Sequence, residues 1–233
     1  MVARLRSAFS DRRLAIVASL ALLTLFALAM LGARMVYTGT RGHTWLAWNL
    51  FLAWIPFVLS LVIYSRARAG ASLRLLVPLG ALWLVFFPNA PYLVTDLKHI
   101  GPGSVPLLYD VLLMSAAAWA GLLLGLTSLF LVHAVVRPLL GVVNAWALVV
   151  GVLAVSSFGI YLGRVERWNS WDVVLHPYPL ADQIATGLLD PLSHPRPIGL
   201  TVLFTSFLLA SYVVLYSFAR LSHEWDALER APR

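Results

Sequence analysis

The sequence predicts an all-α protein, a polytopic bundle of about six transmembrane helices. Composition is the first indication, since 61% of the 233 residues are hydrophobic and 12% are charged, whereas ordinary soluble domains carry about 25% charged residues. Six stretches without Asp, Glu, Lys or Arg are the second, because each holds at least 20 residues and ~20 helical residues cross a bilayer. Backbone polar groups in lipid must be satisfied within the segment, so these stretches are expected to be helices.

The expected helices follow one another in a single membrane domain of residues 1–233. The uncharged core of the first, residues 14–33, has 20 residues, more than the ~7–15 of a signal peptide, so we expect it to remain as an anchor. Residues 164–197 form the longest loop, in which the spacing of Leu180, Ile184 and Leu188 favours a short helix on the membrane surface. The six helices are expected at about residues 14–35, 44–65, 75–95, 108–136, 138–163 and 198–220.

The distribution of basic residues predicts that both termini lie in the cytoplasm. With the N-terminus inside, eleven of the 17 basic residues fall on the inner side of the membrane and six on the outer side, and Lys and Arg are enriched on the cytoplasmic side. These residues lie mainly between the apolar stretches. Membrane orientation therefore explains the net charge of +7 better than nucleic-acid binding does, and no nucleic-acid partner is expected.

Several kinds of chemistry are excluded by what the chain does not contain. It has no cysteine, so it forms no disulfide, thiolate metal site or thiol redox centre. It also contains no P-loop, no nucleophile elbow, no HExxH motif and no glycine-rich dinucleotide fingerprint. We therefore expect no cofactor.

The end of the third stretch is predicted to kink or unwind. Pro88 and Pro91 lack a backbone N–H and disfavour helix for the residue before each of them. The carbonyl groups left free need partners, and the amide of Asn89 is one candidate. Two interpretations remain open: a helix end with Tyr92 as an aromatic anchor, or an unwound segment that lines a cavity and binds a ligand through Asn89.

Two features of the fourth stretch have structural explanations. Asp110 stands in the expected first turn, where the helix dipole and unsatisfied N–H groups favour a carboxylate. Ala117, Gly121 and Gly125 repeat every four residues, and small residues at this spacing let helix backbones approach closely. We expect these small residues to pack helices within one bundle rather than to form a dimer interface.

The densest group of polar and aromatic residues follows the fifth stretch. On a continuing helix, Arg164, Arg167, Trp168 and Trp171 share one face. A girdle at headgroup depth explains the tryptophans and arginines, but it explains less well why acids and an amide crowd into the same nine residues. We therefore retain seven residues as candidates, six for substrate binding and Glu166 for catalysis: Arg164, Glu166, Arg167, Trp168, Asn169, Trp171 and Asp172.

The predicted topology places this group on the outer side together with Asp96, His99 and Asp110. Ionisable groups near apolar surroundings are costly unless paired, so we expect ion pairs there, either as a structural network or as a site. Asp96, His99, Asp110 and His176 also suggest a metal, but this spacing is too common to assign a site. The remaining histidines have no evident companions and are expected to be incidental: His43, His133, His194 and His223.

These motifs resemble those of a bacterial membrane family called domain of unknown function 1361. The resemblance covers roughly residues 45 to 220, and it is carried by residues 48–56, 86–97, 109–110, 157–164 and 167–172. Residues 86–97 and 157–172 contain its most specific motifs. The resemblance implies a multi-pass protein of the bacterial cytoplasmic membrane, and it implies no activity, substrate or cofactor.

Three functions remain open on the sequence. The first is a membrane-embedded binding or scaffold protein, with membrane lipid or another membrane protein as partner. The second is an outer-leaflet enzyme acting on a lipid or lipid-linked substrate, in which Arg164 and Arg167 hold an anionic headgroup and Asp96, Asp110 or Glu166 acts as general acid or base. The third is a small-solute transporter with its site near Asn89.

Overall fold

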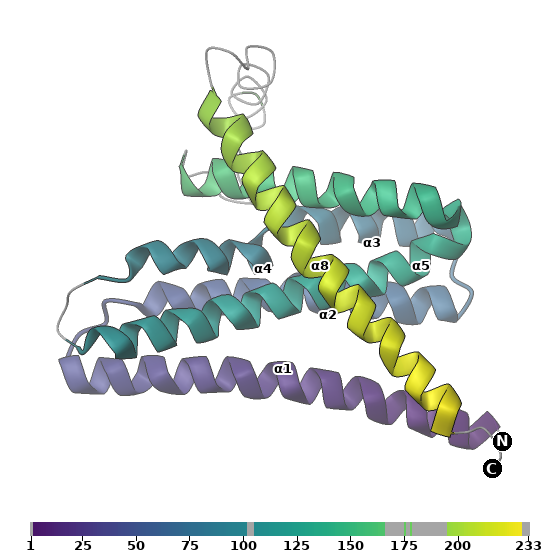
Figure 1. The fold of residues 1–233 in the computed structure, drawn as a ribbon, viewed down its shortest axis with the longest axis horizontal. Coiled ribbons are helices and arrows are strands. Elements are labelled where there is room, and N and C mark those ends of the chain that lie inside the picture. The colour runs from purple at the N-terminus through teal and green to yellow at the C-terminus, as the bar shows by residue number, and fades with distance from the viewer. Residues whose placement is uncertain (1, 102–104, 166–174, 176–177, 179–194, 230–233) are drawn as a thin grey trace. The chain divides into compact units, whose positions relative to one another are not determined.

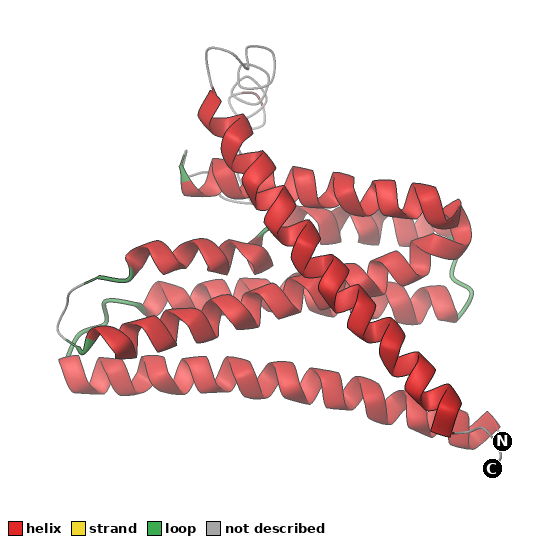
Figure 2. Cartoon of the chain, in the orientation of Figure 1, coloured by secondary structure: helices red, strands yellow, loops and turns green. Residues whose placement is uncertain are grey.

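The computed structural model describes residues 2–101, 105–165, 175, 178 and 195–229. Within these residues it describes the side chains of residues 14–101, 105–165, 175, 178 and 196–221. Every element in this part of the chain is helical (Figure 2). Five helices are long and apolar enough to cross a membrane. The elements are α1 (Val2–Thr38), α2 (Thr44–Arg68), α3 (Leu73–Phe86), α4 (Asn89–Tyr92), the 3₁₀ helix η1 (Leu93–His99), α5 (Leu107–Arg164) and α8 (Pro195–Glu229).

The chain divides into two compact units, which are described one at a time. Unit 1 comprises Met1–Pro56 and Asn89–Gly125, and unit 2 comprises Phe57–Pro88 and Leu126–Arg233. Unit 1 therefore contains α1, α4, η1 and the first parts of α2 and α5. Unit 2 contains α3, α8 and the remaining parts of α2 and α5 (Figure 1).

The interruption predicted at the two prolines of the third stretch is confirmed. Helix α3 ends at Phe86, two turn residues follow, and the chain then forms the four-residue α4 and the seven-residue η1. Runs of 3₁₀ helix longer than three or four residues are uncommon. The segment between Pro88 and His99 thus replaces the regular helix end with a tighter coil.

In unit 1, this irregular segment packs closely on two glycines of α5. A Cβ atom built on Gly121 would lie 2.5 Å from the carbonyl oxygen of Ala90 and from Cδ1 of Leu93, and one on Gly125 would lie 3.2 Å from Cβ of Ala90. The prediction that the small residues pack helices within the bundle is confirmed for these two positions. Side chains larger than glycine would push α4 and η1 away from α5.

Helix α5 reverses direction at Gly141, which has φ +78° and ψ 172° inside the 58-residue element. In a straight helix, His133 and Trp146 would be separated by about 20 Å, yet their ring centroids are 5.2 Å apart. The expected break between residues 136 and 138 is therefore displaced to Gly141. Pro138 stays within the helix, whereas Gly141 adopts a positive φ that glycine tolerates without steric cost.

Unit 2 is held together by contacts from α5 to α3 and α8. The indole Nε1 of Trp83 donates a 2.6 Å hydrogen bond to Oγ of Ser128, and both side chains are buried. After the reversal, Gly159 faces Pro88, whose Cγ lies 3.4 Å from a Cβ built on the glycine. Tyr212 of α8 is fully buried against His133.

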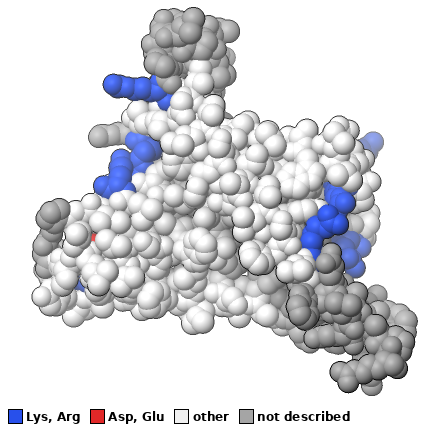
Figure 3. Space-filling view, viewed as in Figure 1, with Lys and Arg blue, Asp and Glu red and all other residues white. Residues whose placement is uncertain are grey.

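The described surface is mostly apolar. Figure 3 shows a broad uncharged face with a few basic side chains at its borders and almost no acidic atom. Large hydrophobic side chains such as Leu22, Val143 and Phe218 are 70%, 81% and 68% exposed. Such a surface suits a lipid environment, because soluble monomers rarely expose large contiguous apolar patches.

Candidate functional site

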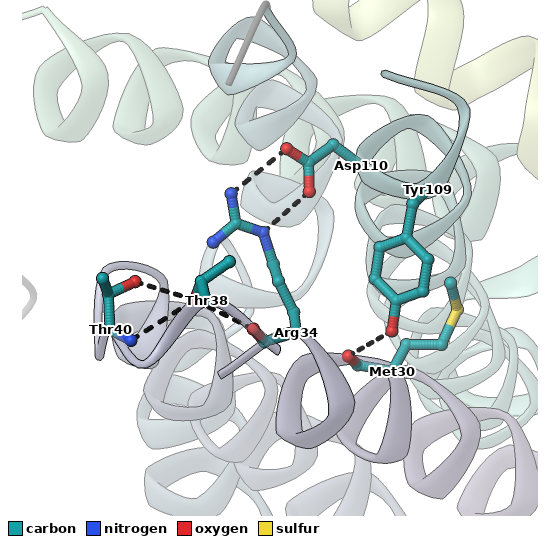
Figure 4. A network of polar contacts seen from close by, with 6 residues as sticks. All are labelled: Met30, Arg34, Thr38, Thr40, Tyr109 and Asp110. Carbon is teal, nitrogen blue, oxygen red and sulfur yellow. Dashed lines mark hydrogen bonds and ion pairs between the residues drawn. The ribbon is translucent and has the colours of Figure 1, made fainter. Parts of the chain in front are cut away.

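A buried charged contact joins α1 to α5 in unit 1. Nε of Arg34 donates to Oδ1 of Asp110 at 2.7 Å, and Nη2 donates to Oδ2 at 3.2 Å. The two residues are 6% and 4% exposed. Figure 4 shows the guanidinium fork turned toward the carboxylate, which is the paired geometry of strong Arg–carboxylate contacts.

The neighbouring residue of α5 makes a second contact with α1. The hydroxyl of Tyr109 donates a 2.7 Å hydrogen bond to the backbone carbonyl of Met30 (Figure 4). Met30 precedes Arg34 by about one helical turn. Tyr109 and Asp110 therefore hold two successive turns of α1 against the beginning of α5.

A second buried carboxylate connects α2 to η1. Asp96 is 1% exposed, and its Oδ2 accepts a 3.1 Å hydrogen bond from Nδ2 of Asn49. The backbone carbonyl oxygen of the same residue lies 3.2 Å from Nδ1 of His99. Asp96 and Asp110 are the two acidic residues whose side chains the structure describes, and both are removed from solvent.

Two histidines and a tryptophan lie beside these carboxylates. The ring of Trp45 lies 4.9 Å from that of His99 and 5.9 Å from that of His43, measured between centroids. Nδ1 of His43 is buried and has no hydrogen-bond partner among the described residues. Burial lowers the pKa of His43 below its ordinary value, and the positive charge of Arg34 lowers it further, while Asp110 acts in the opposite direction.

We call Arg34, His43, Asn49, Asp96, His99 and Asp110 the unit 1 polar network. Each carboxylate already has a partner from another helix, a guanidinium for Asp110 and an amide for Asp96. A buried charge that is paired in this way holds helices in one arrangement, and removing either partner is strongly unfavourable. Among the described residues, no three His, Asp or Glu side chains are grouped so as to hold a metal ion.

The network contains some of the residues predicted from the sequence. Asp96 and Asp110 are members, and Asn89 is half-buried at the start of α4 in the same unit. Arg164 ends α5 in unit 2. The other predicted site residues lie outside the described residues, as do His176 and the surface helix expected at residues 180–189, so their predictions stay untested: Glu166, Arg167, Trp168, Asn169, Trp171 and Asp172.

The sequence interpretation did not include Arg34 among the candidate site residues, because it follows the uncharged core of residues 14–33 and was counted only as a basic residue of the outer side. Helix α1 continues to Thr38, which keeps Arg34 on the helix with its backbone carbonyl bonded to Oγ1 of Thr38 at 2.9 Å. The apolar residues Met35, Val36 and Tyr37 were the available signal for a longer helix. The partner, Asp110, is 76 positions away, so no local pattern identifies it.

The expectation that His43 and His133 have no companions is wrong: His43 belongs to the unit 1 polar network, and His133 makes its contacts in unit 2. This residue is 2% exposed, and its Nδ1 shares a 2.7 Å hydrogen bond with the hydroxyl of Tyr212 in unit 2. Its ring stacks on Tyr216 at 5.6 Å and meets Trp146 edge to face at 5.2 Å. Since Trp146 follows the reversal of α5 and the tyrosines belong to α8, the sequence alone does not bring them together.

Comparison with known proteins gives a family match over most of the chain. The model of a family described as a protein of unknown function (DUF1361) matches residues 48–211. This range includes Asn49, Asp96 and Asp110 of the unit 1 polar network. No curated protein matches, and no solved structure matches.

Proposed function

The chain belongs to the DUF1361 family, and we propose that it is a membrane-embedded binding or scaffold protein built around the unit 1 polar network. The observation that carries the proposal is the buried pair of Arg34 and Asp110, with donor–acceptor distances of 2.7 and 3.2 Å. A carboxylate held by both oxygens is poorly placed to exchange protons with a substrate. It is well placed to keep two helix ends together.

The burial and position of the two described carboxylates give less support to the alternative functions. A lipid-directed enzyme needs a carboxylate within reach of its substrate, whereas the two candidate acids that the structure describes, Asp96 and Asp110, are 1% and 4% exposed. A transporter usually binds its solute near the middle of the membrane. Both carboxylates instead lie near helix ends, in η1 and in the first turn of α5.

The proposed membrane topology has six crossings, with both termini in the cytoplasm of a bacterial cell. At ~1.5 Å per residue, the 58 residues of α5 would measure about 87 Å, far more than the ~30 Å of hydrocarbon. Its reversal at Gly141 supports one crossing before the glycine and one after it. The excess of basic residues on the inner side supports the orientation.

Site-specific labelling tests this topology, because the chain has no cysteine of its own. Single cysteines replace the exposed residues Thr40, Ser72, Lys98 and Leu140. An impermeant thiol reagent added to whole cells should label positions 40 and 98, while positions 72 and 140 react only after the cells are opened. Labelling of positions 40 and 98 from the cytoplasmic side would refute the orientation.

Partner capture tests the binding or scaffold function. The tagged full-length chain is cross-linked in its native membrane, purified into lipid nanodiscs and analysed by mass spectrometry beside the Asp110→Asn variant. A membrane protein or lipid recovered in stoichiometric amount with the wild type, and reduced with the variant, supports the proposal. Turnover of a lipid by the purified chain, or solute uptake by liposomes containing it, would contradict it.

A further inference from the structure

Two arginines in unit 2 converge on one tyrosine of α8. Nη1 of Arg137 donates a 3.3 Å hydrogen bond to the hydroxyl of Tyr216, and the guanidinium carbon of Arg220 lies 6.0 Å from the centroid of the same ring. This distance is at the outer limit for a cation–π contact. The two side chains come from α5 and α8, and both are exposed.

Among the described side chains of unit 2, no acidic group accompanies the positive charges of this pair, and the next acid along α8 is Glu224, four positions after Arg220. Within the part of unit 2 whose side chains the structure describes, residues 57–88, 126–165, 175, 178 and 196–221, there is no Asp or Glu. Two guanidinium groups that share a tyrosine repel each other unless an anion lies between them or solvent screens them. The pair therefore has the charge of an anion site.

The residues around the pair favour an anion that belongs to a membrane lipid. Arg137 lies just before the reversal of α5, and Arg220 lies at the end of the candidate membrane span Arg196–Leu221. Tyrosines and arginines at such positions lie at headgroup depth. Beside them, large apolar side chains are exposed at Leu139, Leu140, Phe218 and Leu221.

We propose that Arg137, Tyr216 and Arg220 bind the phosphate of an anionic membrane lipid, with its acyl chains along the exposed apolar residues next to them. Guanidinium groups suit phosphate because each presents several N–H donors in a planar fork. The Tyr216 oxygen accepts from Arg137, so its own O–H is available to donate to a phosphate oxygen. The site depends on membrane insertion and not on the function proposed for the unit 1 polar network.

The test measures lipid binding by the full-length protein with native mass spectrometry. Detergent-solubilised wild type is titrated with phosphatidylglycerol, with phosphatidylcholine of the same acyl chains, and with inorganic phosphate. We expect preferential binding of phosphatidylglycerol and a loss of about a hundredfold in Arg137→Gln/Arg220→Gln, since each charge-assisted hydrogen bond to the phosphate contributes a factor of about ten. Tyr216→Phe, which keeps the ring, should lose less.

Arg66→Gln/Arg68→Gln is the matched control. It removes two basic residues from α2, and Arg68 also lies 6.0 Å from a tyrosine ring, that of Tyr64, but on its own helix. The control should bind phosphatidylglycerol within about twofold of the wild type, because a general attraction of basic residues to anionic lipid is the alternative being tested. Equal losses in the two double variants would overturn the proposal.

Two further outcomes also count against the proposal. Equal binding of the two lipids by the wild type would show that the net negative charge of the headgroup is not recognised, because phosphatidylcholine carries the same phosphate together with a cation. Displacement by inorganic phosphate at the concentration of the lipid would indicate a soluble anion. If Arg137→Gln/Arg220→Gln is not monodisperse, Arg220→Gln alone replaces it. This variant keeps the bond from Arg137 to Tyr216 and should lose about tenfold, the contribution of one charge-assisted hydrogen bond.

Discussion

The guanidinium of Arg34 and the carboxylate of Asp110 lie 2.7 Å apart and tie the end of α1 to the first turn of α5. The two residues are separated by 76 positions, and neither has more than a small exposed fraction. Asp110 therefore does more than stabilise the beginning of its own helix through the dipole. It is the counter-ion of an arginine that would otherwise be buried alone.

Removal of the Asp110 charge should destabilise the protein. Asp110→Leu leaves Arg34 buried without its counter-ion, and we expect the free energy of unfolding to fall by about 3–5 kcal/mol. Thermal unfolding in detergent, followed by tryptophan fluorescence, measures the change. Arg41→Gln, which removes an exposed arginine from the following loop, should change it by less than about 0.5 kcal/mol.

A double variant tests whether Arg34 and Asp110 stabilise the protein as a pair or independently of each other. Arg34→Met/Asp110→Leu replaces both partners with apolar side chains, and such replacements of buried ion pairs are often neutral or stabilising. Most of the stability lost in Asp110→Leu should therefore return in the double variant. If the double variant is less stable than either single variant, the two residues act independently and our interpretation of the pair is wrong.

Gly121→Ala should disturb the packing of α4 and η1 on α5. The new Cβ would lie 2.5 Å from the carbonyl oxygen of Ala90, and overpacking of this kind costs about 1–3 kcal/mol. Gly151→Ala is the control, because nothing lies within 4 Å of its Cβ position. The melting temperatures of the two variants are compared, and we expect the lower one for Gly121→Ala. Similar melting temperatures would argue against the close approach at Gly121.

Lowering the pH should reduce the stability of the folded protein, in part through protonation of His43. Because burial lowers the pKa of His43 in the folded state, protonation favours the unfolded state. Its contribution is fully present above the ordinary histidine pKa of about 6.5 and is lost as the pH falls below that value. Melting temperatures at pH 7.5 and 5.5 should differ less in His43→Gln than in the wild type. An equal fall in melting temperature in the two proteins would refute the role of His43.

Tyr212→Phe should destabilise unit 2 by removing the bond from its hydroxyl to Nδ1 of His133. A buried polar atom left without a partner costs about 1–3 kcal/mol. His133→Phe/Tyr212→Phe removes both polar groups and should recover part of that loss. Ser211→Ala, on the same helix, removes a hydroxyl bonded to the carbonyl of Phe207, and should leave the melting temperature nearly unchanged.

Some features of the fold are visible in the sequence because they depend on local chemistry. The helical class follows from the long apolar stretches, since a backbone in lipid must bond within its own segment. The interruption after Phe86 follows from Pro88 and Pro91, which remove donors. The tight packing at Gly121 and Gly125 follows from their small size and four-residue spacing.

Other features depend on the way in which distant segments meet. The turning point of α5 was expected beside Pro138 and lies at Gly141, because the tertiary packing selects which residue adopts the positive φ. The sequence by itself determined that this chain forms apolar helices with a few ionisable residues near their ends. The tertiary structure decided that Arg34 pairs with Asp110 and His133 with Tyr212, because helical periodicity relates residues only a few positions apart and carries no information about a partner on another helix.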